Sequence, residues 1–152
     1  MTISTGDILG HSQVGVYLSV VGNNLFYPTS LDKPAIEEIQ QVFDIEMNPL
    51  LIGGSALLGS LICGNSKGIA VADIATEEDL DILSSYGDIV ILESGVNAAG
   101  NLLECNDFGA VVSKSIPNPG VELIGEILGV NTARVRVAGQ DTVGSLLVAN
   151  NK

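Results

Sequence analysis

Positive charge is scarce in this sequence. Six lysine and arginine residues stand against 18 aspartate and glutamate residues, which gives a formal net charge of −12. Direct binding of a nucleic-acid backbone needs clustered basic residues that displace counterions from the phosphates. The composition therefore argues against DNA as a partner, and the bulk charge would repel RNA or an anionic membrane and attract a basic protein. Acidity also keeps a protein soluble, and the composition is equally compatible with that simpler role.

The sequence also contains few cysteine and histidine residues and lacks long apolar runs. Cys63 and Cys105 cannot build a disulfide framework, and each is expected to be a small buried residue in a reduced protein. The one histidine, His11, lies in a glycine-bounded N-terminal stretch. Apolar runs are interrupted well short of a membrane span, and the first residues lack the basic and apolar segments of a secretory signal. We therefore expect a cytoplasmic protein.

Sequence motifs for cofactor and metal chemistry are missing as well. Residues 59–64 fit the first part of a phosphate-binding loop, but Asn65 and Ser66 follow where Lys and Ser or Thr are needed. No cluster of histidine and cysteine indicates zinc. The acidic residues between 73 and 81 do not have the spacing of a calcium loop and fit a solvated helix face better. We predict neither a metal nor a cofactor.

A glycine-anchored segment recurs along the chain at a nearly fixed spacing. Its first glycine stands at positions 15, 59, 100 and 144, at intervals of 44, 41 and 44 residues. In the copies at 59–68 and 100–109, asparagine follows six residues after this glycine and a second glycine follows nine residues after it. The last copy stops at Lys152, and the first is weaker because Asn23 and Asn24 come late. Such a period is typical of stacked or radially arranged supersecondary units.

Each unit is predicted to contain two strands, a helix and a third strand. In the second copy, the turn residues 65–68 divide two apolar runs, which predicts a hairpin. Thr76, with Asp79 three residues later, is a capping-box pattern that indicates the start of a helix. The predicted strands of this copy are 57–63, 69–72 and 88–92.

The neighbouring copies repeat this order. In the third copy, Asn118 is expected to cap a helix with Pro119 at its first position, and Gly129 is expected to end it. The other predicted elements are strands at 100–105, 110–112 and 134–137, and a first-unit helix at 34–43. We expect a single α/β domain, 1–152, with unit boundaries near 11–52, 53–94 and 95–138 and the start of a fourth unit at 139–152.

Several segments together carry a resemblance to a known family. Residues 53–61, 99–112 and 142–152 resemble translation initiation factor six of archaea and eukaryotes, and the resemblance runs along essentially all 152 residues. It implies a pentein fold, a β/α propeller of five β-β-α-β units in a ring. This sequence has three units and the first strand of a fourth, so we expect it to be part of a longer protein.

The resemblance also implies a function that involves no catalysis. Family members bind the large ribosomal subunit, prevent its association with the small subunit and take part in large-subunit biogenesis. The expected contact is a ribosomal protein beside the sarcin–ricin loop, with a lesser contact to ribosomal RNA. Matching positions give the expected ribosome-binding residues, which are Asn65, Ser66, Lys67, Asn106, Asp107 and Asn150. Asparagine before glycine is also ordinary turn chemistry, and the turn at Asn23 and Asn24 matches less well.

Two other functions stay open at this point. Pentein folds also host enzymes that modify guanidino groups with a nucleophilic cysteine, which here would have to lie in a missing portion. A structural repeat protein without ribosome binding is the other alternative. Arg134 and Arg136 share one face of a predicted strand; they would contact RNA or an acidic partner, or simply occupy the exposed side of the sheet.

Overall fold

The computed structural model describes residues 4–93 and 98–152, and it contains the same structural unit three times. The first unit comprises α1 (Val14–Tyr17), β1 (Ser19–Val21), β2 (Asn24–Pro28), α2 (Lys33–Val42) and β3 (Glu46–Leu50). The second comprises α3 (Leu58–Leu61), β4 (Ile62–Gly64), β5 (Gly68–Ala72), α4 (Glu77–Ser84) and β6 (Asp88–Leu92). The third comprises α5 (Ala99–Leu102), β7 (Leu103–Cys105), β8 (Gly109–Ser113), α6 (Asn118–Leu128) and β9 (Asn131–Val135).

Every unit folds into a separate three-stranded sheet. The first two strands form an antiparallel hairpin, and the third strand pairs in parallel with the second, as in the register Ile62↔Val71 and Ala70↔Val90. A parallel return requires a crossover connection, which α2, α4 and α6 provide. The mixed α/β class and the β-β-α-β order predicted from the sequence are therefore confirmed. The expected boundary between the second and third units, at 94–95, touches residues outside the described ranges.

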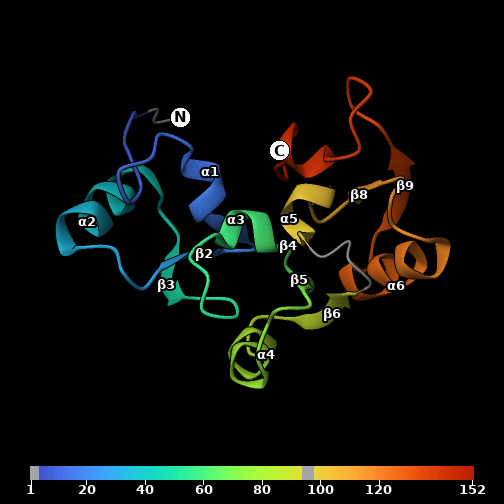
Figure 1. The fold of residues 1–152 in the computed structure, drawn as a ribbon, viewed down its shortest axis with the longest axis horizontal. Coiled ribbons are helices and arrows are strands. Elements are labelled where there is room, and N and C mark those ends of the chain that lie inside the picture. The colour runs from blue at the N-terminus through green and yellow to red at the C-terminus, as the bar shows by residue number, and fades with distance from the viewer. Residues whose placement is uncertain (1–3, 94–97) are drawn as a thin grey trace.

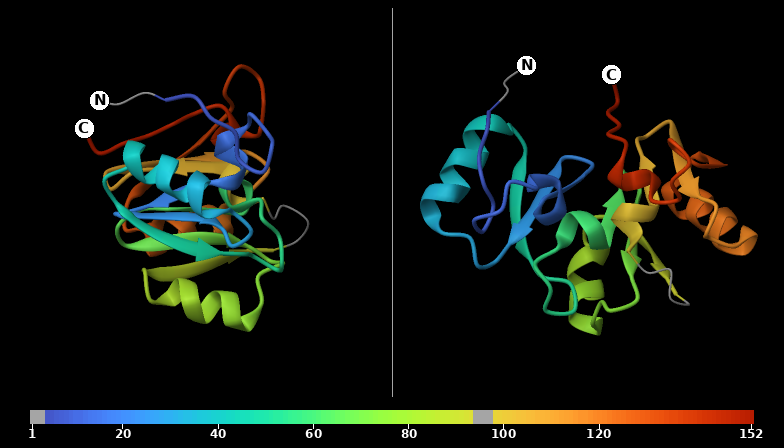
Figure 2. Two further views of the ribbon diagram at one scale, coloured as in Figure 1. Left: turned by 90° about the vertical axis from the view of Figure 1, so that its left-hand side faces the viewer. Right: turned by 45° about the horizontal axis from the view of Figure 1, so that its top comes forward.

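The three units lie side by side around a common centre (Figure 1). The long helices α2, α4 and α6 lie on the outside, whereas the short helical turns α1, α3 and α5 lie near the centre. A turned view shows the strands of successive units layered next to one another, with both chain ends on one side (Figure 2). Each unit is centred on its own cluster of buried hydrophobic residues. The cluster of the third unit also includes residues of the second unit, namely Cys63, Ala70, Val90 and Leu92.

Helical turns replace the first half of two predicted strands, so the strand predictions at 57–63 and 100–105 are wrong in that half. Strands begin only at Ile62 and Leu103. The physical reason is the repeated glycine, which lets a turn pack directly on the preceding one. A Cβ atom at Gly59 would lie 1.9 Å from the Gly15 carbonyl oxygen, and one at Gly100 would lie 2.1 Å from the Gly59 carbonyl oxygen.

The last copy of the glycine segment continues this packing without forming a strand. Its turn is the 3-10 helix η1 (Val143–Ser145), where a Cβ atom at Gly144 would lie 2.2 Å from the Gly100 carbonyl oxygen. Residues 146–152 lie beside β7 but are not assigned to a strand. Strands β1, β4 and β7 each pair with the following strand in a hairpin, whereas no strand is assigned within residues 146–152.

The predicted start of α4 and the predicted end of α6 are confirmed, whereas the predicted start of α6 is wrong. Thr76 and Asp79 form the predicted capping box of α4, and Gly129 follows α6 with φ +60°. The predicted cap at Asn118 is wrong, because Pro117 occupies the capping position and Asn118 lies inside the helix. The Asn118 side chain instead accepts a hydrogen bond from Arg134. The predicted strand at 134–137 is displaced, since β9 ends at Val135.

Candidate interaction surface

The hairpin turns of successive units adjoin one another and form one end of the molecule. We call this surface, made of residues 22–23, 65–67, 106–108 and 150–151, the turn end. Neighbouring turns contact each other in sequence: a Cβ atom at Gly22 would lie 3.2 Å from Ser66 Cα, and the Ser66 amide donates to Asp107 Oδ1 over 2.9 Å. Asp107 in turn donates its amide to Asn151 Oδ1 over 2.9 Å.

Repeated asparagines close the hairpins of the second and third units. Asn65 Oδ1 accepts from the amides of Lys67 and Gly68, at 2.9 and 3.1 Å. Asn106 Oδ1 accepts in the same way from the amides of Phe108 and Gly109, at 2.9 and 3.0 Å. The side-chain oxygen thereby satisfies two backbone donors that the hairpin leaves unpaired, which explains why asparagine recurs there.

The same asparagines also connect each unit to the next. Asn65 Nδ2 donates to the carbonyls of Asn106 and Leu128, at 3.1 and 2.9 Å. Asn106 Nδ2 donates to the Asn150 carbonyl at 2.8 Å. Only 3% of Asn65 is exposed, and two acceptor and two donor contacts complete the hydrogen-bonding capacity of its amide. Asn65 thus positions the turns, whereas Asn106 is less buried and Asn150 is exposed.

The remaining sequence-predicted residues lie at the outer edge of the turn end. Ser66 and Lys67 are exposed, and Lys67 Nζ donates to the Gly129 carbonyl at 3.0 Å, where α6 ends. Asp107 Oδ2 accepts from Asn151 Nδ2 at 2.7 Å. The backbone hydrogen bond from Ser66, followed by further hydrogen bonds and the charge of Lys67, lowers the pKa of the Asp107 carboxyl. All six predicted residues are therefore brought together at the turn end.

Sequence reasoning missed the most prominent side chain of this surface. Phe108 is 75% exposed, although large aromatic side chains usually bury most of their area. The signal was available, because a phenylalanine stands within a turn bounded by Asn106 and Gly109, where polar residues are the rule. Asn151, which pairs with Asp107, was missed because its partner lies 44 residues away.

The first unit does not share this asparagine arrangement. Its hairpin closes through Gly22, with φ +58°, and the last register pair is Val21↔Asn24. Asn24 Oδ1 accepts from Asn48 Nδ2 at 3.2 Å, which keeps its side chain within its own unit. The weaker sequence match at Asn23 and Asn24 therefore corresponds to a different turn.

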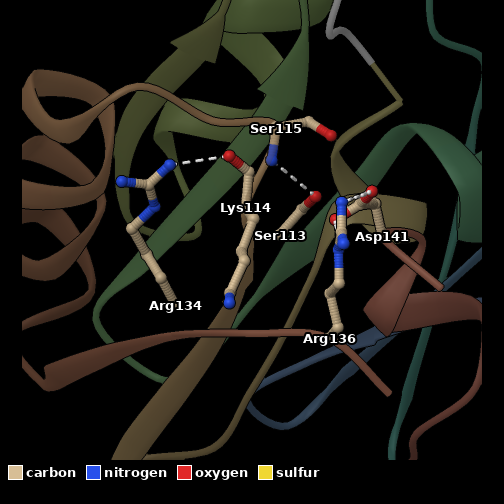
Figure 3. Close-up of polar contacts among 6 residues, drawn as sticks. All are labelled: Ser113, Lys114, Ser115, Arg134, Arg136 and Asp141. Carbon is tan, nitrogen blue, oxygen red and sulfur yellow. Dashed lines mark hydrogen bonds and ion pairs between the residues drawn. The ribbon is translucent and has the colours of Figure 1, made fainter. Parts of the chain in front are cut away.

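A basic cluster lies apart from the turn end, where β8 and β9 finish (Figure 3). Lys114 lies between Arg134 and Arg136. Arg134 donates to the Lys114 carbonyl at 2.6 Å, and Arg136 forms a two-point ion pair with Asp141 at 2.9 and 3.0 Å. The hydrogen bond from Arg136 lowers the pKa of Asp141. Both arginines are thus exposed but engaged in contacts within the third unit and the segment after it.

A central cavity of about 530 Å³ lies where the short helical turns and inner strands meet. Cys63, Cys105 and Glu104 line it, and burial raises the pKa of the Glu104 carboxyl. His11 does not line this cavity and stacks on Tyr17 with ring centroids 5.6 Å apart. Within 4–93 and 98–152, no group of three or more metal-ligating side chains is found, and no helix there is long and apolar enough to cross a membrane.

Comparison with known proteins confirms the family resemblance. The profile of the eIF-6 family matches residues 3–152. Translation initiation factor 6 of Methanoculleus marisnigri is 34% identical over 148 residues, which cover 97% of this chain and 67% of that protein. The protein of the same name from Methanocorpusculum labreanum is 32% identical over 147 residues, covering 97% and 66%. That from Picrophilus torridus is 32% identical over 146 residues, covering 96% and 67%. The chain thus spans about two thirds of the length of these relatives.

Proposed function

The chain belongs to the eIF-6 family, and we propose that it binds the large ribosomal subunit and sterically prevents that subunit from joining the small one. The observation that carries the proposal is the family match over residues 3–152, together with relatives that are named translation initiation factors. The protein acts in the cytoplasm and contributes to large-subunit biogenesis. Its three units are compatible with the five-unit ring expected of a pentein.

The turn end is the docking surface in this proposal. Its backbone is held by inter-unit hydrogen bonds through Asn65, Ser66 and Asn106. Recognition surfaces commonly consist of loops held on a rigid frame, because a preformed surface loses less conformational entropy on binding. The turn end meets this condition, and the steric function requires size and affinity rather than a reactive group.

The turn-end residues have two distinct tasks. Asn65 and Asn106 position the turns, since their side-chain amides bond to backbone within and between units. Ser66, Lys67, Asp107 and Asn150 lie at the edge and contact the partner. Phe108 supplies the apolar anchor, because buried aromatic side chains dominate the energy of many protein interfaces.

A basic protein surface fits this face better than RNA does. The chain carries a net charge of −12, and the hydrogen bonds on Asp107 favour its ionised form. Long-range attraction would bring a basic ribosomal protein to the turn end. The proposed partner is therefore a ribosomal protein beside the sarcin–ricin loop, with a lesser contact to ribosomal RNA.

Co-sedimentation with purified large ribosomal subunits tests the proposal. The chain is expected to pellet with large subunits and to reduce the yield of joined ribosomes when small subunits are added. Phe108→Ser should weaken binding by about tenfold or more, since loss of an interface anchor costs on the order of 2 kcal/mol.

A matched control keeps this test specific. Leu123 is also an exposed apolar residue, 46% accessible, but it lies on α6. Leu123→Ser should leave co-sedimentation unchanged. If the chain fails to pellet with large subunits, the ribosomal function is wrong; if both serine variants bind as well as the original, the turn end is not the docking surface.

A further inference from the structure

Two cysteines from different units meet at the central cavity. Cys63 is the middle residue of β4, and Cys105 is the last residue of β7. Their Sγ atoms are 3.7 Å apart, although 42 residues separate them in the sequence. They are 9% and 8% exposed, and both line the cavity of about 530 Å³.

We propose that Cys63 and Cys105 form a reversible disulfide that joins the second unit to the third. A disulfide requires an S–S separation of about 2.05 Å, so each sulfur would have to move by less than about 1 Å. The contact between β4 and β7 supports so small a movement, because the turns that follow both strands are tied together by the hydrogen bond from Asn65 Nδ2 to the Asn106 carbonyl.

The oxidant in this proposal is a low-molecular-weight disulfide that enters through the cavity. The thiolate of one cysteine attacks one sulfur of the oxidant, forms a mixed disulfide and releases the first small thiolate, which takes up the proton. The second cysteine then attacks the protein sulfur of the mixed disulfide and releases the second small thiol. The protein loses two hydrogen atoms and two electrons, and the oxidant is reduced to two thiols.

The surroundings of the pair set its reactivity. Hydrogen bonding to Cys105, and then burial, raise the pKa of the Cys63 thiol well above its ordinary value. A protonated Cys63 can donate its S–H to the sulfur of Cys105. Oxidation should therefore be slow at neutral pH and faster in mild alkali, because the thiolate is the reactive form.

Oxidation would link two units that are otherwise joined by the chain and by noncovalent contacts. Cross-linking residues this far apart removes much of the conformational freedom of the unfolded chain. The oxidised protein is therefore expected to unfold at a temperature roughly 10 °C higher than the reduced protein, and reduction should reverse the change.

The test is equilibration of the full chain with oxidised glutathione, followed by acid quenching and intact-mass measurement. The expected product is a monomer that has lost two hydrogen atoms and carries no glutathione. Cys63→Ala and Cys105→Ala are the matched controls, and each should stop at the mixed disulfide. A stable glutathione adduct on the original chain, or dimers linked between chains, would overturn the proposal.

A second measurement does not depend on variants that fold. The equilibrium constant for closing the disulfide is compared between the native chain and the chain unfolded in urea. If native packing favours the disulfide, this constant should be roughly a hundredfold to a thousandfold higher in the native chain. The reason is thermodynamic linkage: a disulfide that stabilises the fold must itself form more readily in the folded state. An equal or lower constant in the native chain would show that the fold opposes the disulfide. Neither measurement involves ribosomes, so failure here leaves the proposed function standing.

Discussion

The junction between the first and second units and the junction between the second and third share one backbone contact and differ in their side chains. Both rest on a glycine packed against a preceding glycine carbonyl, Gly59 on Gly15 and Gly100 on Gly59. The first junction is then completed by rings: Phe26 and Tyr86 meet edge to face at 5.0 Å. The second is completed at the turn end, where Asn65 donates to backbone carbonyls of the third unit.

The comparison shows that the distance between units and the strength of their attachment depend on different contacts. The glycine contact is common to both junctions and leaves no room for a side chain, so it fixes how closely the units approach. The ring contact and the Asn65 hydrogen bonds lie on different parts of the unit. The turn end at one junction can therefore change without altering the distance between the units. Substitutions at the two junctions should therefore differ in how much they lower the free energy of unfolding.

The largest effect is expected from Gly100→Ala. Its new methyl group would lie 2.1 Å from the Gly59 carbonyl oxygen, so the second and third units would have to separate. We expect a loss of about 3 kcal/mol or more in the free energy of unfolding, measured by urea denaturation. Gly15→Ala is the matched control, since a Cβ atom there meets nothing within 4 Å; it should change stability by less than about 0.5 kcal/mol. Equal losses at both positions would refute the shared role of this contact.

Asn65→Ala should rank second. It leaves the amides of Lys67 and Gly68 and two carbonyls without their partner in a largely buried site, at a cost of about 2–3 kcal/mol in the free energy of unfolding. Asn106→Ala should cost about 1 kcal/mol, because water can reach the less buried groups it leaves. Asn23→Ala, in the turn that lacks the arrangement, serves as the control and should be neutral. A large loss of stability in Asn23→Ala would show that the asparagine contacts do not distinguish the second junction from the first.

Tyr86→Phe is expected to have a smaller effect at the first junction. The ring contact with Phe26 is retained, while the hydrogen bond from the Tyr86 hydroxyl to Asn48 Oδ1, 3.0 Å long, is lost. The expected cost is about 1 kcal/mol, measured by thermal and urea unfolding. Tyr86→Leu should cost more, because it also removes the aromatic pair. If both variants are neutral, the first junction does not depend on its rings.

The smallest effect concerns acid unfolding at the turn end. The pKa of Asp107 is lowered in the folded protein, chiefly by the Ser66 amide. Its contribution is therefore present above the unfolded value of about 3.9 and is lost as the pH falls through the folded pKa. Asp107→Asn should reduce the fall in unfolding temperature between pH 5 and pH 2 by about 1–2 °C, since exposed charges contribute little. An unchanged acid dependence would contradict this assignment.

Much of the fold follows from local sequence patterns, and the errors have two origins. Turn residues, the Thr76–Asp79 capping box and the glycine period are local signals, and they predicted the hairpins, α4 and the repeats correctly. The helical turns at 58–61 and 99–102 were missed because a short apolar run has too few residues to separate a period of two from one of 3.6. Asn118 was misassigned because its partner, Arg134, is distant in sequence.

The six predicted site residues lie together at the turn end, but the sequence did not show how their surroundings differ. The repeated asparagines marked the turn end, and the structure brings all six predicted residues to it. Sequence alone could not show that Asn65 is buried under the third unit, since that depends on how Leu128 is placed. The exposure of Phe108 could have been predicted from the sequence, because an aromatic residue is unusual in a hairpin turn.

The asparagine bonds that join the units end on backbone carbonyls, which every residue type possesses. A substitution at Phe108 or Asn150 therefore leaves the acceptor groups in place, and the scaffold keeps its dimensions while the outward-facing chemistry varies. Mutation can therefore change the outward-facing side chains of the turn end at low structural risk.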